Sequence, residues 1–325
     1  MTKTTMPVRG HIERVLEILH DTERDGLLTD RQDEGLSGIS GLKTVGVLQR
    51  LARMFADEAD ACYLEIGVFQ GLTLVSTALE VPELTCFGID NFATLDPEGE
   101  NQAIVRERLY RFGTANATLI DADFEAALEG LDARLQGRKI GVYFIDGPHD
   151  YRSQMVCLLA AKRHLHERAV IIVDDANYPD VRWSTRDFLI GHPDYKMVFE
   201  AYSPAHPANL AAENLKRWED GWLNGVNILV RDADGLLLDM LPPVDGDRTV
   251  YFNEWLVHRL QAAHLAPEAV ALAGAIARGD ENAERDAREI LLNAFGKDKA
   301  RFDGRNADRN TDSDGLNEAR FNTLS

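Results

Sequence analysis

From Cys62 onward, short apolar runs rich in β-branched and aromatic residues alternate with segments of helical spacing. Such alternation is typical of repeated βα units, which pack as a parallel sheet covered by helices on both faces. The expected strands are CYLEIG (62–67), TCFGID (85–90), ATLID (117–121), VYFID (142–146), AVIIVDD (169–175), MVFEAY (197–202) and VNILVRD (226–232). The pattern therefore predicts an α/β domain built on a seven-stranded, mostly parallel sheet.

The last two expected strands differ from the others in how they are connected. Residues 203–225 lie between them and contain two prolines and two tryptophans, with no obvious crossover helix. A parallel pair needs such a crossover, whereas an antiparallel pair does not. We therefore expect the sheet to close with an antiparallel last strand.

Helical spacing of apolar residues continues on both sides of this domain. Residues 11–20 and 41–56 are expected to form helices that lead into it, and residues 250–295, rich in Ala and Leu, to form helices packed on the core. The expected parts are an N-terminal helical segment (1–40), the main domain (41–245), a C-terminal helical addition (246–297) and a tail (298–325).

The tail has few large apolar residues and many Asn, Asp, Arg and Gly, so we expect it to be disordered. Within it, residues 310–321 resemble the first half of a calcium-binding loop. Phe321 occupies the place of the bidentate Glu, which favours a solvated tail over a calcium site.

Charge excludes some classes of partner. The 325 residues include 35 Lys and Arg against 54 Asp and Glu, a net charge of −19 that repels nucleic acid and anionic membrane surfaces. The first residues lack the apolar core of a signal peptide, and the longest aliphatic run, Ala169 to Val173, is too short to span a bilayer. We expect a cytoplasmic protein that acts on a small molecule. Its cysteines, Cys62, Cys86 and Cys157, are expected to be buried thiols.

The segment YLEIGVFQGLT predicts a ligand site, because a strand enters a Gly-x-x-x-Gly turn, Gly67 to Gly71, that precedes a helix. Dinucleotide enzymes use a turn at this place with the pattern Gly-x-Gly-x-x-Gly. Here Phe69 replaces the middle glycine, and Glu65 adds negative charge where a pyrophosphate would lie. A cationic nucleoside such as S-adenosylmethionine (SAM) is the better match.

Two further acidic strand ends complete this nucleoside site. Glu65 is the candidate partner of the cationic methionyl end, Asp90 is placed to accept both ribose hydroxyls, and Asp123 to accept from the adenine amino group. Taken singly, each carboxylate could instead be a solvated strand end or a helix cap. The ordered set with Gly67 and Gly71 favours SAM binding.

A second acidic group follows the next two strands. Asp146 ends one strand, and Asp174 and Asp175 end the neighbouring one, so three carboxylates are expected at one edge of the sheet. Like charges brought together need a cation, and Mg²⁺ or another hard divalent ion prefers oxygen ligands. The alternative is that these acids cap helices or bind water.

His149 follows Asp146 by three residues and is the candidate general base, with Asp146 beside it in the catalytic group. A base near the cation could deprotonate an acceptor hydroxyl that then attacks the SAM methyl group. The competing interpretation of a lone loop histidine is a surface or helix-capping residue.

The order LEIGxxxG, an acidic second strand end, FIDGxHxY and a strand ending in Asp-Asp resembles the class I SAM-dependent methyltransferases over about residues 40–232. FIDGxHxY is typical of a branch that includes many bacterial small-molecule and sugar methyltransferases. The resemblance implies a Rossmann-like seven-stranded sheet, SAM over the glycine turn, a metal on Asp146, Asp174 and Asp175, and a histidine base. The chain departs from the branch at Pro148, and Asn177 is an alternative third metal ligand to Asp175.

The acceptor is expected to be a small molecule, with a sugar or glycoside as one option. Its pocket is expected to include the loop after Asp175 and the segment with Trp218 and Trp222, although packing is the favoured role of the two tryptophans. Two alternatives stay open: an NAD-dependent oxidoreductase and a non-catalytic SAM-binding protein. The sequence does not fix the acceptor, the need for a metal, or whether the chain forms a homo-oligomer.

Overall fold

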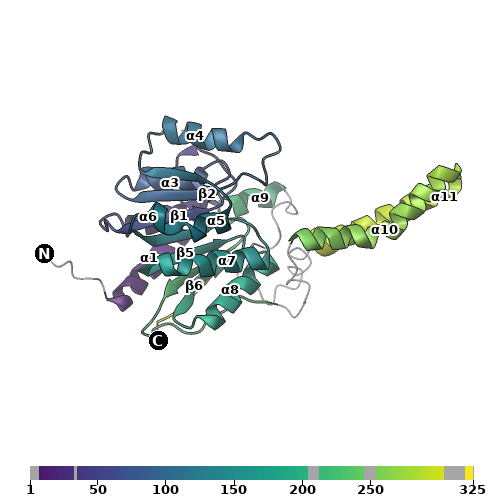
Figure 1. The fold of residues 1–325 in the computed structure, drawn as a ribbon. Coiled ribbons are helices and arrows are strands. Elements are labelled where there is room, and N and C mark those ends of the chain that lie inside the picture. The colour runs from purple at the N-terminus through teal and green to yellow at the C-terminus, as the bar shows by residue number, and fades with distance from the viewer. Residues whose placement is uncertain (1–6, 33–34, 204–211, 245–253, 304–318, 325) are drawn as a thin grey trace.

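The computed structural model describes residues 7–32, 35–203, 212–244, 254–303 and 319–324. Its body is a sheet with helices on both faces, and a pair of helices projects from this body (Figure 1). The expected α/β architecture is confirmed.

The sheet contains all seven expected strands, with boundaries within a few residues of those predicted. Among the described residues its order is β3-β2-β1-β4-β5-β7-β6-β8. Strands β1 to β5 are mutually parallel, and β7, β6 and β8 each run antiparallel to the strand before them in this order. The bounds are β1 (Ala61–Ile66), β2 (Thr85–Asp90), β3 (Ala117–Asp121), β4 (Lys139–Ile145), β5 (Leu165–Asp174), β6 (Tyr195–Ala201), β7 (Val226–Arg231) and β8 (Arg320–Phe321).

Two hydrophobic cores lie on the two faces of the sheet, because successive side chains of a strand point to opposite faces. Tyr63 and Phe144 pack with α1 to α4, whereas Leu64 and Tyr143 pack with α5 to α8. Each of these four side chains is fully buried, which stabilises the fold by roughly 1.5–3 kcal/mol per side chain. The helices are α1 (Val8–Asp25), α2 (Leu42–Arg53), α3 (Leu72–Glu80), α4 (Asn101–Arg111), α5 (Phe124–Glu129), α6 (Leu131–Leu135), α7 (Tyr151–Ala161), α8 (Pro179–Gly191), α9 (Ala212–Glu219), α10 (Glu254–Arg278) and α11 (Glu281–Asp303).

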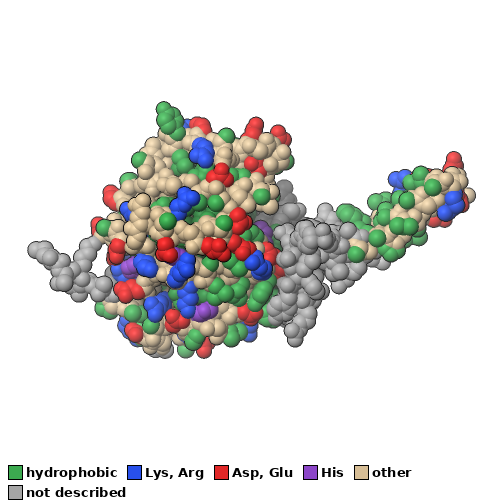
Figure 2. All heavy atoms as spheres, in the orientation of Figure 1, with side chains coloured by type: hydrophobic (Ala, Val, Ile, Leu, Met, Phe, Trp, Pro, Cys, Tyr) green, Lys and Arg blue, Asp and Glu red, His purple; other side chains and the backbone are tan. Residues whose placement is uncertain are grey.

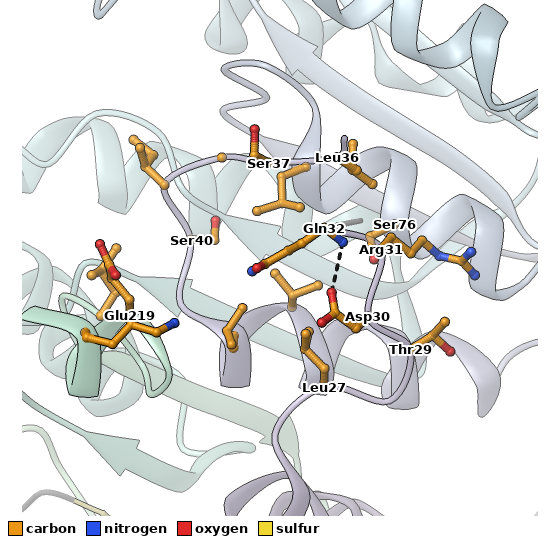
Figure 3. A pocket seen from close by; sticks show the side chains of 17 residues that line it. Leu27, Thr29, Asp30, Arg31, Gln32, Leu36, Ser37, Ser40, Ser76 and Glu219 are labelled. Carbon is orange, nitrogen blue, oxygen red and sulfur yellow. Dashed lines mark hydrogen bonds between the residues drawn. The ribbon is translucent and has the colours of Figure 1, made fainter. Parts of the chain in front are cut away.

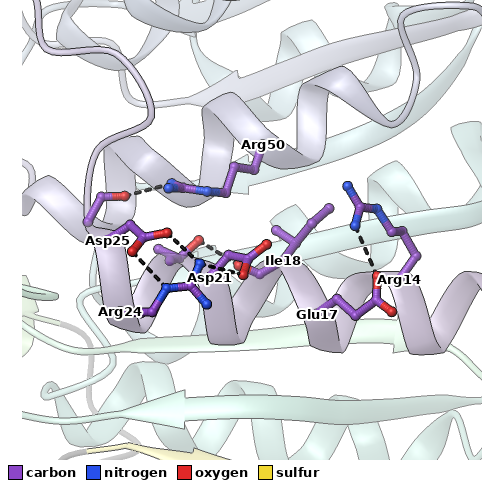
Figure 4. A network of polar contacts seen from close by, with 9 residues as sticks. Arg14, Glu17, Ile18, Asp21, Arg24, Asp25 and Arg50 are labelled. Carbon is purple, nitrogen blue, oxygen red and sulfur yellow. Dashed lines mark hydrogen bonds and ion pairs between the residues drawn. The ribbon is translucent and has the colours of Figure 1, made fainter.

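The N-terminal helix α1 is part of the core. Its apolar residues recur at helical spacing and are buried, namely Ile12, Val15, Ile18 and Leu19. Arg50 of α2 donates to the carbonyl of Gly26 at 2.6 Å and so satisfies the backbone just beyond the end of α1 (Figure 4). The ion pairs on the outer side of α1, such as Arg14 with Glu17, are exposed and contribute little.

Residues 319–324 lie against the sheet, whereas the sequence predicts a disordered tail. Arg320 pairs with the buried Glu200 at 2.6 Å, and Phe321 stacks on His20 with ring centroids 4.0 Å apart. The Asn322 amide donates to the carbonyls of Met197 at 2.7 Å and Leu238 at 2.8 Å. A few specific contacts with an edge strand therefore hold this segment, and composition does not reveal them.

Residues 304–318, which include most of the possible calcium loop, lie outside the described residues. The calcium interpretation therefore stays a prediction.

The helices α10 and α11 form a hairpin and do not pack on the core as expected. Gly279, with φ +67°, ends α10, and Asp280 caps α11 by accepting from the backbone N–H of Ala283 at 3.0 Å. This short turn makes the two helices antiparallel neighbours. Among residues 265–296 only Ala275 is buried, so the hairpin stands away from the body (Figures 1 and 2).

Among the described helices, none is both long enough and apolar enough to cross a bilayer.

We predict that His11 makes stability depend on pH. Burial, together with the positive charge of Arg168 and His166, lowers the pKa of His11 to about 4 from 6.5. The fold therefore favours the neutral ring, so this contribution is complete above pH 6.5 and is lost as the pH falls toward 4. The loss should reach about 3 kcal/mol.

The measurement is the free energy of unfolding by urea at several pH values between 4 and 7 for the wild type and His11→Gln. The variant should lose less stability than the wild type on acidification. His20→Gln, on the exposed side of the same helix, is the control. Parallel pH curves for the wild type and His11→Gln would contradict the prediction.

Candidate active site

Strand β1 lies between β2 and β4, so the ends of these three strands share one edge of the sheet. The N–H of Gly67 donates to Ile89 at 2.9 Å on one side, and the N–H of Asp146 donates to Ile66 at 2.8 Å on the other. The strand order reverses between β1 and β4, and ligands of open parallel sheets bind at such a position. Glu65, Asp90 and Asp146 are therefore brought to one site.

The glycine turn after β1 needs its first glycine. Gly67 has φ +86°, and a Cβ there would lie 1.8 Å from the carbonyl oxygen of Asp146. Gly71, with φ +84°, begins α3 in the left-handed region. Asp90 holds the turn between them, because its Oδ2 accepts from the N–H groups of Val68 at 2.8 Å and Phe69 at 2.9 Å. The Asp90 carboxylate thus fixes the turn, and its predicted ribose contact would be an additional bond.

Glu65 is a buried carboxylate with one oxygen that lacks a partner. The Tyr63 hydroxyl donates to Oε2 at 2.5 Å, while Oε1 has no hydrogen-bond partner among the described residues. Burial raises the pKa of Glu65 to about 8. When such a buried carboxylate is ionised, a cationic group placed against it stabilises the charge. The site thus fits the amino or sulfonium group of SAM.

Asp123 has a local structural role. Its Oδ1 accepts from the N–H groups of Glu125 at 3.0 Å and Ala126 at 3.3 Å, so it caps α5. The cap is the alternative that the sequence left open for this residue. The adenine contact of Asp123 stays a prediction.

A cluster of potential metal ligands lies at the ends of β4 and β5. One ligand atom from each of Asp146, His149 and Asp175 lies within 4.8 Å of the others. Burial raises the pKa of Asp146 well above its usual range, and the carboxylates of Asp174 and Asp175 raise it further. Burial and the neighbouring Asp175 likewise raise the pKa of Asp174. A bound cation would relieve this repulsion, so the donors present fit a divalent metal ion.

Asp175 is the centre of this cluster. Its Oδ2 lies 2.7 Å from Nε2 of His149, and its Oδ1 accepts from the side-chain amide of Asn224 at 2.6 Å. The His149 ring also stacks on Tyr178, with centroids 4.5 Å apart. Asp174 is placed differently, because its Oδ1 accepts from the N–H of Asp175 at 3.0 Å. Asp175 and Tyr178 therefore both contact His149.

The structure gives Asn177 a packing role. It is buried, its amide donates to the Ser203 carbonyl at 3.0 Å, and its Oδ1 accepts from the Ser203 N–H at 3.1 Å. These bonds favour Asp175 over Asn177 as the third ligand. Trp222 is also buried, with its ring centroid 5.0 Å from that of Phe199, which agrees with the packing role expected of it.

Sequence reasoning missed Asn224. It lies 49 residues after Asp175, on the turn that precedes β7, and only the antiparallel pairing of β7 with β5 brings the two together. The only sequence signal is the dipeptide Asn224-Gly225, which is typical of a turn.

A cavity of about 540 Å³ lies between residues 27–45, α3 and α9 (Figure 3). Its lining includes Leu72, which follows Gly71, and Leu223, which precedes Asn224. The other walls come from residues 27–45 and from α9, and neither Glu65 nor Asp146 lines the cavity. The lining is largely apolar with several hydroxyl and charged groups, as in sites for small molecules.

Residues 64–176 match the family model described as a methyltransferase domain, and this segment runs from β1 to the loop after β5. Residues 64–176 therefore belong to a methyltransferase domain. Its strand order and its glycine turn agree with the resemblance found in the sequence. A search of curated protein sequences gives no match.

Solved structures similar to this methyltransferase include an O-methyltransferase from Bacillus cereus in complex with SAH, with 11% identity and a TM-score of 0.42, covering 71% of this chain and 94% of that one. Another is the O-methyltransferase TomG from Streptomyces achromogenes, involved in tomaymycin synthesis, in complex with SAM. It has 14% identity and a TM-score of 0.43, and the match covers 71% of this chain and 93% of that one. A third is the calicheamicin methyltransferase CalS11, with 14% identity and a TM-score of 0.44, covering 72% of this chain and 100% of that one. The family match and the strand order stand without these likenesses, whose TM-scores are all below 0.5.

We predict that Gly67→Ala disrupts the methyltransferase turn, because its Cβ would collide with the Asp146 carbonyl. Gly137→Ala is the matched control, since Gly137 has φ +87° but no atom within 4 Å of an added Cβ. The control should lose about 1–3 kcal/mol from backbone strain alone. Gly67→Ala should lose more and bind S-adenosylhomocysteine at least about tenfold more weakly by isothermal titration calorimetry. Equal effects of the two substitutions would rule out the collision.

Proposed function

We propose that this methyltransferase transfers the methyl group of SAM to a hydroxyl group of a small-molecule acceptor, with the help of a divalent cation such as Mg²⁺. The observation that carries the proposal is the cluster of Asp146, His149 and Asp175 at the same sheet edge as Glu65 and the glycine turn. One group of residues would hold the nucleoside, and the other would prepare the acceptor.

Five residues are proposed to bind SAM, namely Glu65, Gly67, Gly71, Asp90 and Asp123. The unpartnered Oε1 of Glu65 would accept from the methionyl amino group, and the Gly67–Gly71 turn would let the backbone approach the nucleoside. Asp90 would accept from the ribose hydroxyls while it continues to hold the turn, because each carboxylate oxygen can accept more than one bond. Asp123 would contact the adenine from the N-cap position of α5.

Asp146, Asp174 and Asp175 are proposed to hold the cation. When bound, Mg²⁺ would lower the pKa of an acceptor hydroxyl and fix its oxygen. Burial and mutual repulsion already raise the pKa of Asp146 and Asp174, so a metal ion would replace protons at these carboxylates. Asn224 would keep the Asp175 carboxylate in place.

His149 is proposed as the general base for the acceptor hydroxyl. Asp175, at 2.7 Å from Nε2, and the stacked ring of Tyr178 would fix the orientation of the imidazole. The same short distance supports a second role, because an imidazole this close to two carboxylates could itself be a metal ligand. Experiments on metal affinity separate the two roles.

The 540 Å³ cavity is proposed to bind the acceptor, because its lining residues Leu72 and Leu223 adjoin Gly71 and Asn224 in the sequence. This volume is in the range of small-molecule sites, and its apolar lining would bind the non-reacting part of the acceptor. A sugar or glycoside remains one candidate class. The direct test is incubation of the protein with methyl-labelled SAM and a metabolite extract, followed by identification of the labelled product. Binding of SAM with no label in any acceptor would favour a non-catalytic SAM-binding protein.

We predict that chelation abolishes methyl transfer and that Mg²⁺ restores it. The measurement is label transfer with EDTA, without EDTA, and after addition of excess Mg²⁺. Asp146→Asn should also weaken Mg²⁺ binding, measured by calorimetry, because it removes a charged oxygen ligand. Asp132→Asn, an exposed residue of α6 that is none of the proposed site residues, is the control. Methyl transfer that persists in EDTA would exclude a metal-assisted reaction.

We predict that His149→Ala lowers the turnover rate by about 100-fold or more, because a general base contributes that much to such reactions. Binding of Mg²⁺ and S-adenosylhomocysteine should be retained. A loss of Mg²⁺ affinity as large as that of Asp146→Asn would make His149 a ligand instead. A rate within about tenfold of the wild type would leave it only a positioning role.

A further inference from the structure

The α10–α11 hairpin exposes an apolar surface that the body of the protein does not cover. Val270 is 71% exposed, Leu292 is 63% exposed, and Ile276, Ile290 and Phe295 are also exposed. Figure 2 shows hydrophobic side chains on the surface of the projecting helices. Residues 269–277 of α10 contain no charged side chain. In contrast, the apolar residues of α1 are almost completely buried against the sheet. Leu292 and Phe295, three residues apart, share one side of α11 and are candidates for a binding surface.

A hairpin of two helices buries little of its own surface. Each helix has one neighbour, so only one stripe of each is covered, and most helical stability in proteins comes from tertiary packing. Stable helical bundles of this kind usually contain four helices around a common core. The hairpin therefore supplies half of such a core.

We infer that a second copy of this chain covers the hairpin, so that two hairpins pack as a four-helix bundle and the protein is a dimer. Size supports this partner. The helices have 25 and 23 residues, which gives a length of about 35 Å. With helix axes about 10 Å apart, one face of the hairpin offers about 700 Å². A standard interface buries about 800 Å² per partner.

Charge also favours a second copy. Residues 254–303 contain nine acidic and seven basic residues, a net charge of −2, although the whole chain carries −19. Two bodies of such high negative charge repel each other, so copies are expected to meet where the charge is lowest. The hairpin is such a place, and it projects away from the body (Figure 1).

The test is the mass of the full chain by light scattering during gel filtration. The wild type should have about twice the 36.2 kDa of one chain at micromolar concentration. A variant with Ile276→Lys and Leu292→Lys should have the mass of one chain. The matched control, Ile190→Lys with Leu238→Lys, changes two residues that are 61% and 57% exposed on the body and should remain a dimer.

Crosslinking gives a second readout, because it detects the dimer directly and does not depend on a substitution that breaks it. The cysteines Cys62, Cys86 and Cys157 are buried, so Leu292→Cys introduces an exposed thiol. A short bis-maleimide should link two copies through Leu292→Cys and not through Ile190→Cys. Circular dichroism checks that the hairpin stays helical.

A wild-type chain that is monomeric would overturn the inference. So would a dimer that survives the Ile276→Lys, Leu292→Lys change, or a monomer that binds neutral lipid vesicles through the hairpin. Binding of S-adenosylhomocysteine is measured on the same samples. It tests the proposed function separately, because the hairpin contributes none of the proposed site residues.

Discussion

The parallel pairing of β1 with β2 and β4 is the constraint on which the site depends. Parallel strands end at one edge, so any acidic residue at a strand end is brought beside those of its neighbours. The backbones that follow β1 and β4 pass very close to each other at Gly67 and the Asp146 carbonyl, where there is no room for a Cβ. This contact joins the nucleoside turn to the candidate metal ligands through the backbone, and a shift of either strand would move both groups.

Placing several carboxylates at one edge is unfavourable without positive charge. Burial raises the pKa of Glu65, and burial together with the neighbouring Asp174 and Asp175 raises the pKa of Asp146, so ionising these acids here is unfavourable. A ligand of positive charge would lower these pKa values. Folding stability and cation binding are therefore coupled at these residues. A bound cation stabilises the ionised carboxylates that the fold holds together, and so it stabilises the fold.

Much of the fold and of the site could be predicted because both follow from local patterns. The seven strands are visible as apolar runs, and the acidic residues that end them are adjacent in sequence to the strands that position them. Asn224 could not be predicted as a partner of Asp175, because 49 residues and an antiparallel pairing separate them. The N-cap role of Asp123 was one of two alternatives, since an acidic residue before a helix fits either a cap or a ligand contact.

The C-terminal part was predicted least well, and the reason is also physical. Residues 319–324 are held by Arg320 on a buried Glu200 and by Asn322 on two carbonyls, so specific bonds and not composition decide their place. Both Leu237 and Leu324 lie at this same edge, where they form a β-bridge. The α10–α11 hairpin thus projects between two segments that are fixed to one sheet. A unit inserted at that position can bind a partner without moving the strands that form the active site.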